Sequence, residues 1–474
     1  MKAAFYGLRA KQISLVFVAL ICSTILIWAW EKNPILTNFI PSHSSWLQVS
    51  SDVPTGSAEG NVRMQDTKSH KFGHVLVPPT VIESGGSHSE VLEEEHLQEG
   101  ESLQLSAPTY VFVNSTGSTK DGQKEMILGQ GNEACNYAEG KWVVDEKRPL
   151  YSGYGCKQWL SGMWACRLTQ RMNFDYETLR WQPKNCQMDE FEGEIFLKRM
   201  KDKTIAFVGD SLGRQQFQSL MCMVTGGVGQ LDVMDVGVEY GLVKAPGAIR
   251  PDGWVYRFPG TNTTILYYWS ASLCDLEPID PSNSSTEYAM HLDRPPSFLR
   301  RFISQFDVLV LNTGHHWNRG KLNANRWVMY VGGKPNTDME IAEIWNARNF
   351  TIHSIVKWVD SQLPKYPKLK AFYRSISPRH FVGGDWNTGG SCDNENPMSI
   401  GKEVSQDESR DPSAWSAVRG TKVKLLDITG PSQVRDEGHI SRFSIKGTTG
   451  VQDCLHWCLP GVPDTWNEML AAQV

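Results

Sequence analysis

Residues 204–212 read Thr-Ile-Ala-Phe-Val-Gly-Asp-Ser-Leu. The apolar run at the start is typical of a buried strand, and the pattern over 212–224 is that of an amphipathic helix. Gly209 allows a sharp turn between the two elements. Ser211 is therefore expected at a strand-to-helix junction, near the positive end of the helix, where backbone N–H groups are available to an oxyanion.

The rest of the C-terminal part repeats this alternation of apolar strands and helices. Strands are expected at 204–208, 264–269, 307–311, 370–374 and 423–428, and further helices at 296–305 and 339–363. Buried strands that alternate with helices predict an α/β sandwich with a mainly parallel sheet. Ligands of such sheets bind beyond the carboxyl ends of the strands, so the candidate site lies there.

A second candidate segment, 453–456, reads Asp-Cys-Leu-His. A serine nucleophile needs a base, and an imidazole base needs a carboxylate to orient it. Asp453 and His456 can lie on one side of a single turn and so supply both groups to Ser211. Taken singly, Gly-Asp-Ser also suits a helix cap and Asp-x-x-His an unrelated pair. Together they favour the SGNH-type serine hydrolase or acyltransferase arrangement, a three-layer sandwich.

Two further residues are candidates for supporting roles. Asn312 follows the strand at 307–311, where its amide could donate to a tetrahedral oxyanion together with the Ser211 N–H. The alternative is a turn former, because the sequence continues Thr-Gly. Arg214, one turn after Ser211, either supports the helix start or contacts a polar substrate, and structural support is the preferred interpretation.

The charge distribution excludes a generally basic protein. The 474 residues carry a formal charge of −5, with +3 in residues 1–30, −8 in residues 31–134 and 38 side chains of each sign in residues 135–474. A nucleic-acid partner is not expected, since such proteins carry a basic face or stripe. A neutral and aromatic-rich surface suits an uncharged partner better.

The N-terminal part indicates a membrane-anchored luminal protein. Eighteen uncharged residues, 13–30, follow a basic flank, which predicts a transmembrane signal anchor with a cytosolic N-terminus. The alternative is a cleaved signal peptide, but the apolar run is longer than usual and no small-x-small pattern follows it. The predicted organisation is a cytosolic tail (1–12), the anchor (13–30), a flexible acidic stem (31–134) and a luminal catalytic domain (135–474), divided into a disulfide-rich subregion (135–200) and the α/β body (201–474).

Sequons and cysteines agree with an oxidising lumen. Nine of the ten cysteines follow the anchor, so an oxidising compartment pairs most of them and leaves one free. Spacing alone does not determine the pairs. Glycosylation sequons occur at Asn114, Asn262, Asn283 and Asn349.

The chain resembles the plant trichome-birefringence-like proteins, which are polysaccharide O-acetyltransferases of the Golgi. The resemblance covers nearly everything from Cys135 onward, and its most specific block reads Asp-Cys-Leu-His-Trp-Cys-Leu-Pro-Gly. The sequence departs from the family's usual residues at 214–216 and at 315–317. Neither stretch belongs to the presumed triad, but the second puts acceptor specificity in question. The motifs that carry the resemblance are 135–143, 207–216, 377–380, 384–392 and 453–461.

The resemblance implies specific roles. Ser211 is the nucleophile that carries the acetyl group, His456 its base and Asp453 the orienting acid. No cofactor is bound; the acetyl donor is acetyl-CoA or an acetylated intermediary from a membrane protein. The acceptor is a cell-wall polysaccharide such as xylan, and the protein is a single-pass type II Golgi membrane protein. The implied disulfides are Cys135–Cys186, Cys156–Cys222, Cys166–Cys458 and Cys392–Cys454, with Cys274 unpaired.

Three other interpretations remain open at this point. The same triad serves an acetyl-esterase that deacetylates wall polysaccharide. A non-catalytic glycan-binding protein would use Trp317, Trp386 and Trp457 as flat platforms, although each is more typical of a core residue. A zinc site built on Cys454, His456, Cys458 and the pair His315–His316 is disfavoured, because the lumen favours disulfides over thiolate ligands.

Overall fold

A computed structural model describes residues 135–474, except 228–231, 398–399, 406–407 and 446–450. The expected tail, anchor and stem, together with Asn114, lie outside the described residues. Within the described part, no helix combines the length and the apolar character needed to cross a membrane.

The largest sheet has seven strands in the order β14-β12-β9-β3-β6-β5-β4. Neighbouring strands from β14 to β6 are parallel, whereas β5 pairs antiparallel with β6, and β4 with β5. The mainly parallel sheet expected from the sequence is therefore confirmed. Its strands are β3 (Thr204–Gly209), β4 (Met234–Asp235), β5 (Gly253–Phe258), β6 (Thr263–Trp269), β9 (Val308–Leu311), β12 (Lys370–Arg374) and β14 (Lys424–Leu426).

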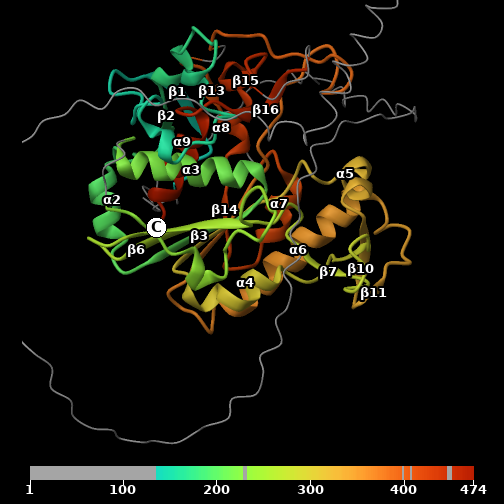
Figure 1. The fold of residues 1–474 in the computed structure, drawn as a ribbon. Coiled ribbons are helices and arrows are strands. Elements are labelled where there is room, and N and C mark those ends of the chain that lie inside the picture. Colours follow the sequence, from blue (N-terminus) through green and yellow to red (C-terminus); the bar gives the residue numbers. More distant parts are fainter. Residues whose placement is uncertain (1–134, 228–231, 398–399, 406–407, 446–450) are drawn as a thin grey trace, which may run out of the picture. The chain divides into compact units, whose positions relative to one another are not determined.

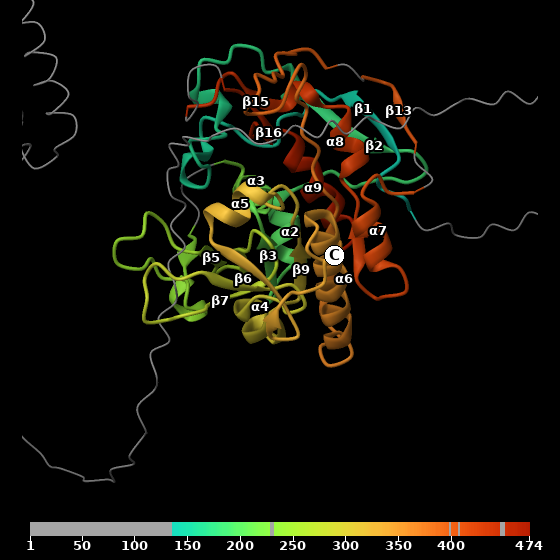
Figure 2. The ribbon, with the colours of Figure 1, turned by 90° about the vertical axis from the view of Figure 1, so that its right-hand side faces the viewer.

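Helices cover both faces of this sheet, which gives three layers (Figures 1 and 2). Side chains of β3 alternate between two cores: Ile205 and Phe207 pack with α3 and α9, and Ala206 and Val208 with α4, α6 and α7. This alternation is what a strand buried on both faces requires. The first face carries α2 (Gly193–Arg199), α3 (Ser211–Thr225) and α9 (Val462–Ala471); the second carries α4 (Ser297–Phe302), α6 (Ile344–Gln362) and α7 (Pro412–Val418).

Two expected helices differ from the structure at their ends. The helix expected at 339–363 begins only at Ile344, because the Asp338 carboxylate accepts from the backbone N–H groups of Glu340 and Ile341 and holds a turn there. The helix expected at 296–305 is α for its first part and continues as a 3-10 helix, Ile303–Gln305. Both differences concern hydrogen bonds that the apolar pattern does not reveal.

Smaller sheets surround the central one. A three-stranded sheet, β13-β1-β2, joins the N-terminal subregion to a late segment and comprises β1 (Gly140–Val144), β2 (Leu179–Pro183) and β13 (Glu403–Val404). A four-stranded sheet contains β7 (Asp275–Pro278), β8 (Tyr288–His291), β10 (Trp327–Val331) and β11 (Lys334–Pro335). A two-stranded sheet pairs β15 (His439–Ser441) with β16 (Asp453–Trp457).

The remaining elements are short. The helices α5 (Arg319–Ala324) and α8 (Thr429–Gln433) are accompanied by 3-10 helices at Cys156–Gln158, Cys166–Leu168, Asp175–Thr178, Gly237–Tyr240 and Asp436–Gly438.

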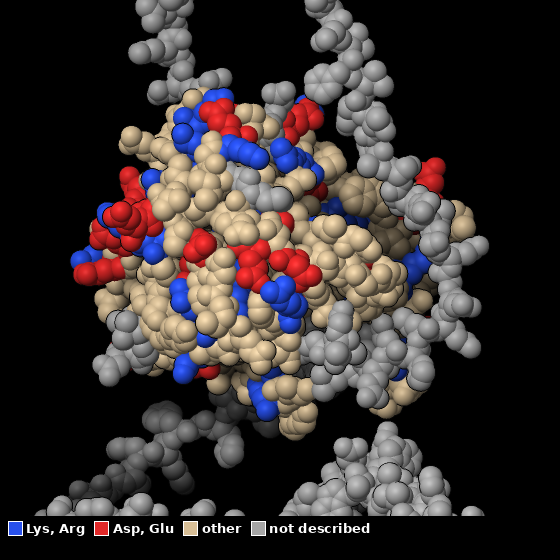
Figure 3. Space-filling model, turned by 90° about the horizontal axis from the view of Figure 1, so that it is seen from above, with Lys and Arg blue, Asp and Glu red and all other residues tan. Residues whose placement is uncertain are grey.

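On the face drawn in Figure 3, basic and acidic side chains lie interspersed among uncharged ones.

Of the four disulfides among the described residues, one lies within the subregion, two join the subregion to the body, and one joins two segments of the body. They are Cys135–Cys186, Cys156–Cys222, Cys166–Cys458 and Cys392–Cys454, the pairs that the resemblance implied, and Cys274 is free and buried. Cys156 is joined to α3, and Cys454 and Cys458 flank His456. The end of β16 is therefore held covalently on both sides of this histidine.

Replacing Cys392 and Cys454 together with alanine should lower the free energy of unfolding by about 2–4 kcal/mol, because the unfolded chain gains the freedom of a long loop. Calorimetry should show a lower Tm. Cys274→Ala, which breaks no disulfide, is the matched control, and a Tm as high in the double variant as in the control would contradict the structural role of this pair.

Candidate active site

Ser211 is the first residue of α3 and follows the end of β3 directly. The carboxylate of Asp210 caps the helix by accepting from the backbone N–H of Leu212 at 3.0 Å. A Cβ on Gly209 would lie 2.0 Å from Oδ1 of Asn312 and 2.7 Å from its carbonyl oxygen, so only glycine fits. This close approach lets β3 and β9 present their carboxyl ends side by side.

Ser211, His456 and Asp453 form a continuous hydrogen-bonded chain. The distance from Ser211 Oγ to His456 Nε2 is 2.8 Å, and His456 Nδ1 lies 3.0 Å from Oδ2 of Asp453. With Nδ1–H donating to the carboxylate, Nε2 is free to accept the hydroxyl proton. The three side chains that the sequence analysis selected therefore meet in the geometry of a serine nucleophile, its base and an orienting acid.

The carboxylate of Asp453 is held in its ionised form. Burial alone would raise its pKa, but the charge and ring N–H of His456, with the backbone N–H groups of His456 and Leu455, outweigh burial and lower the pKa well below its usual range. Asp453 is therefore negatively charged and orients the imidazole.

The turn expected between Asp453 and His456 is an irregularity in a strand. Opposite β16, His439 pairs with Trp457 and Ser441 with Asp453, so the three residues 454–456 face one residue of β15. This bulge brings the two catalytic candidates to the same side, and bulges commonly redirect side chains next to active sites.

Gln215 holds this strand against α3. Its side chain is completely buried; Nε2 donates to the carbonyl of Trp457 at 2.6 Å, and Oε1 accepts from the Trp457 N–H at 3.1 Å. Gln215 lies within 214–216, the stretch that departs from the family's usual residues and that was not expected to fall on the triad. The structure shows that this departure includes the side chain that fixes the residue next to His456.

Trp164, which the sequence analysis did not select, contacts the presumed base directly. Its ring stacks on the imidazole of His456, with centroids 5.6 Å apart and planes at 27°, and it is completely buried. Its indole N–H donates to Gln218 at 2.7 Å, and the guanidinium of Arg214 lies 4.7 Å from its ring centre. This contact agrees with the interpretation of Arg214 as a structural support, which the sequence analysis preferred.

The implied Cys166–Cys458 disulfide was the signal that pointed toward Trp164. Trp164 lies two residues before Cys166, and His456 lies two residues before Cys458, so the bridge places their segments near one another. Whether the two rings meet depends on the direction in which the segments run past the bridge, and only the fold shows this.

Asn312 supports the helix cap. Its amide donates to Oδ1 of Asp210 at 2.6 Å, and the side chain is buried after β9. The structure thus places Asn312 beside the nucleophile segment. An additional role toward an oxyanion stays a prediction.

The histidines around His456 are neutral at neutral pH. Burial lowers the pKa of His439 to about 3 and that of His315 to about 4. Nδ1–H of His439 donates to the carbonyl of His456 at 3.0 Å, and Nε2–H of His315 donates to the carbonyl of Ser377 at 2.8 Å. A positive charge that forms on His456 therefore meets no imidazolium beside it.

The comparisons with known proteins agree with this geometry. Residues 188–473 match the model of the PC-Esterase family, described as a GDSL/SGNH-like acyl-esterase family found in Pmr5 and Cas1p, and residues 133–187 match the PMR5 N-terminal domain. In Arabidopsis thaliana, protein trichome birefringence-like 14 is 59% identical over 72% of this chain and 87% of its own length. Trichome birefringence-like 15 is 53% identical over 72% of this chain and 71% of its own length.

The chain belongs to the trichome birefringence-like family. Membership supports an acetyltransferase- or esterase-like function at the cell wall. The two family models meet at residue 188, whereas the sequence analysis set the limit of the subregion at residue 200. Helix α2, which lies between these limits, packs against α3 of the body.

The zinc site considered in the sequence analysis would use the thiolates of Cys454 and Cys458. Cys454 and Cys458 are both oxidised to disulfides and offer no thiolate. Among the described residues, no group of three or more His, Cys, Asp or Glu side chains is placed to hold a metal ion.

The aromatic platforms and the sequons are placed as follows. Trp317 and Trp457 are buried, so they belong to the core, whereas Trp386 is exposed.

Asn262 and Asn283 are exposed in loops and accessible to glycosylation. Asn349 lies within α6 and is half-buried, which is less favourable for modification.

Trp164→Ala should lower kcat by on the order of 10- to 100-fold with little change in KM, because the imidazole loses the surface that fixes its plane. Trp164→Phe keeps a flat ring and should restore most of the rate. Steady-state kinetics with both variants tests this, and equal kcat values for the alanine variant and the unmodified protein would contradict it.

Proposed function

We propose that this protein is a polysaccharide O-acetyltransferase that moves an acetyl group through Ser211 to a hydroxyl of a cell-wall polysaccharide such as xylan. The observation that carries the proposal is the 2.8 Å contact between Ser211 Oγ and His456 Nε2, with His456 in turn bonded to Asp453. Family membership supports the chemistry, and the proposed place of action is the Golgi lumen, with the protein anchored through residues 13–30.

In the first half-reaction, His456 Nε2 takes the proton from Ser211 as Oγ attacks the acetyl carbonyl of the donor. The bond from the acetyl carbon to the donor then breaks, and His456 returns the proton to the leaving group. Backbone N–H groups at the start of α3, with Asn312 as a candidate second donor, stabilise the oxyanion by about 3 kcal/mol per hydrogen bond. The donor is acetyl-CoA or an acetylated intermediary supplied by a membrane protein.

In the second half-reaction, a sugar hydroxyl attacks the acetyl group on Ser211. His456 takes the proton of this hydroxyl, the acetyl–Oγ bond breaks, and the proton passes to Ser211. Transfer to the sugar exceeds hydrolysis only if the glycan is held in place and water is excluded or badly oriented. Recognition of the acceptor is therefore as important as the triad.

An acetyl-esterase is the second candidate, and the description of the PC-Esterase family as acyl-esterases favours it. The two activities share every step up to the attack on acetyl-Ser211, where water replaces the sugar. Incubation with acetylated and with unacetylated xylan, xyloglucan, mannan and pectin oligosaccharides separates them. We expect acetate gain by unacetylated glycan in the presence of a donor, and net release without gain would identify an esterase.

Ser211→Ala should abolish acetyl transfer and leave the Tm unchanged, because the hydroxyl lies at a partly exposed helix start and contributes only a hydrogen bond to the fold. Ser282→Ala, at an exposed serine outside the site, is the matched control. Glycan binding that persists in both variants, with no turnover by the unmodified protein on any donor, would instead identify a non-catalytic glycan-binding protein.

Asp453→Asn should lower kcat by about 10⁴-fold, since an amide no longer selects the tautomer in which Nδ1 carries the proton. The low pKa of Asp453 means that the carboxylate is ionised throughout the range from about pH 5 to about pH 8. Steady-state kinetics of the two proteins at pH 7, where Asp453 is ionised, measures this loss. A kcat for Asp453→Asn within tenfold of the unmodified protein's would contradict the orienting role.

A further inference from the structure

A buried polar network joins the N-terminal subregion to two helices of the body. Tyr151 comes from the subregion, Ser219 from α3 and Asp464 from α9, and all three are buried. The hydroxyls of Tyr151 and Ser219 donate to Oδ1 of Asp464 at 2.9 and 2.6 Å. The backbone N–H of Gly461 donates to Oδ2 of the same carboxyl at 2.8 Å. Asp464 is therefore the group at which the three parts meet.

The three donors to Asp464 are neutral groups. Arg148 is bonded to Glu468 instead, with Nη2 2.5 Å from Oε1, and these two side chains are 4% and 3% exposed. Glu468 follows Asp464 by one turn of α9, so its negative charge opposes a second one there. The cavity beside Asp464 has a volume of about 10 Å³, room for at most one water molecule. An ionised Asp464 thus has no cation bonded to it and no space for a hydration shell.

The surrounding acidic groups have partners of their own. Asp145 is paired with Arg180, and Glu177 with Arg167. The other titratable or charged groups that face Asp464 are Arg148, Tyr151 and Tyr176 of the subregion and Glu468 of α9.

The site can also hold Asp464 in its protonated form. Oγ of Ser219 accepts from Nδ2 of Asn467 at 2.9 Å, and it lies 3.5 Å from Sδ of Met223, a second acceptor for its own proton. When Oδ1 of Asp464 carries a proton, Ser219 turns its O–H toward Met223 and accepts from Asp464. Tyr151 and Gly461 continue to donate. Both protonation states are therefore hydrogen-bonded, and they differ in the cost of burying a charge.

Burial, to which the charge of Glu468 adds, outweighs the three hydrogen bonds and raises the pKa of Asp464 from its ordinary value of 3.8 to about 7. Between these two values the folded protein binds a proton that the unfolded chain has lost. The stability that this proton confers is present in full below the ordinary value, and it is lost as the pH rises through the value in the folded protein.

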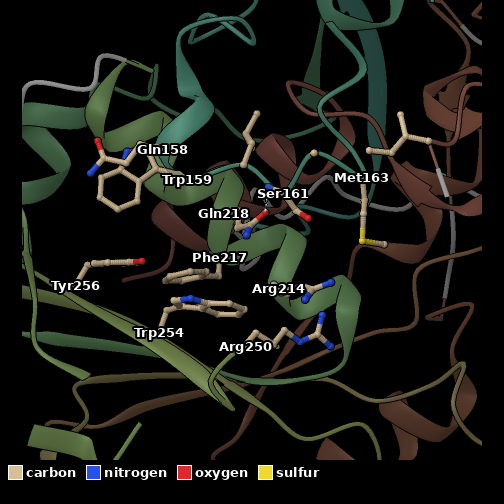
Figure 4. Close-up of a pocket in the computed structure, with 13 residues that line it drawn as sticks. Gln158, Trp159, Ser161, Met163, Arg214, Phe217, Gln218, Arg250, Trp254 and Tyr256 are labelled. Carbon is tan, nitrogen blue, oxygen red and sulfur yellow. Dashed lines mark hydrogen bonds between the residues drawn. The ribbon is translucent and has the colours of Figure 1, made fainter. Parts of the chain in front are cut away.

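We propose that Asp464 is a proton-sensitive contact that holds the N-terminal subregion to α3 and α9 more firmly in mildly acidic than in alkaline solution. This contact bears on the candidate active site because α3 presents Ser211 and the subregion supplies Trp164, whose ring stacks on His456. The pocket of about 390 Å³ in Figure 4 also lies between these parts, since 158–163 and α3 both line it. The proposal concerns how the parts are held together and does not depend on the reaction.

Urea unfolding at a series of pH values tests the proposal. The full-length protein and Asp464→Asn, which keeps the shape of the side chain and does not titrate, are unfolded from about pH 5 to about pH 9. We expect the unfolding constant of the unmodified protein, divided by that of the variant, to rise about tenfold per pH unit up to about pH 7 and to stay constant above it. Asp280→Asn, at an exposed aspartate with a lowered pKa, is the matched control and should give a constant ratio.

Hydrogen exchange of the unmodified protein adds a test that needs no variant. After correction for the intrinsic rates, peptides from 147–160 should exchange faster at about pH 8 than at about pH 6. A ratio of unfolding constants that is flat or falls between about pH 5 and about pH 7 would overturn the proposal, as would equal exchange of these peptides at the two pH values. Neither measurement requires turnover, so a failure of the proposed acetyl transfer leaves both results interpretable.

Discussion

The hydrogen bond between Ser211 and His456 joins residues 245 positions apart in the sequence. Each partner is fixed by its own local structure: the serine by the Asp210 cap at the start of α3, and the histidine by the bulge in β16. The two local structures must then be held together. Gln215, which binds both main-chain groups of Trp457, does this from within the same helix that presents Ser211.

Two disulfides also constrain the distance between Ser211 and His456. The disulfides Cys166–Cys458 and Cys392–Cys454 anchor β16 on either side of His456. The strands that they support are short, since β15 contains three residues and β16 five. A serine hydroxyl and an imidazole exchange a proton only while they stay within about 0.5 Å of hydrogen-bonding geometry, and short strands alone do not provide that rigidity.

The central sheet could be predicted because short, continuous stretches of sequence indicate its strands and helices. The apolar run of β3, the glycine after it and the helix that follows are each visible in one window of sequence, and parallel neighbours follow from strand–helix alternation. Strand β5 was not predicted, because Arg257 and half-buried aromatic residues interrupt its apolar run. It also pairs antiparallel with β6, which strand–helix alternation does not indicate. The bulge at 454–456 was also beyond reach, because it depends on which residues β15 places opposite.

The side chains that meet as a triad were selected from the sequence, whereas the residues that position them were missed. Ser211, Asp453 and His456 have side chains whose chemistry is specific, so the sequence points to them. Trp164 and Gln215 are ordinary core residues by type, and only the fold shows what they contact. Trp164 comes from the region that matches the PMR5 N-terminal domain, and its ring stacks on His456 of the region that matches the PC-Esterase family. The N-terminal subregion therefore supplies part of the candidate active site, and a substitution within it can change the setting of the presumed base without any change in the triad.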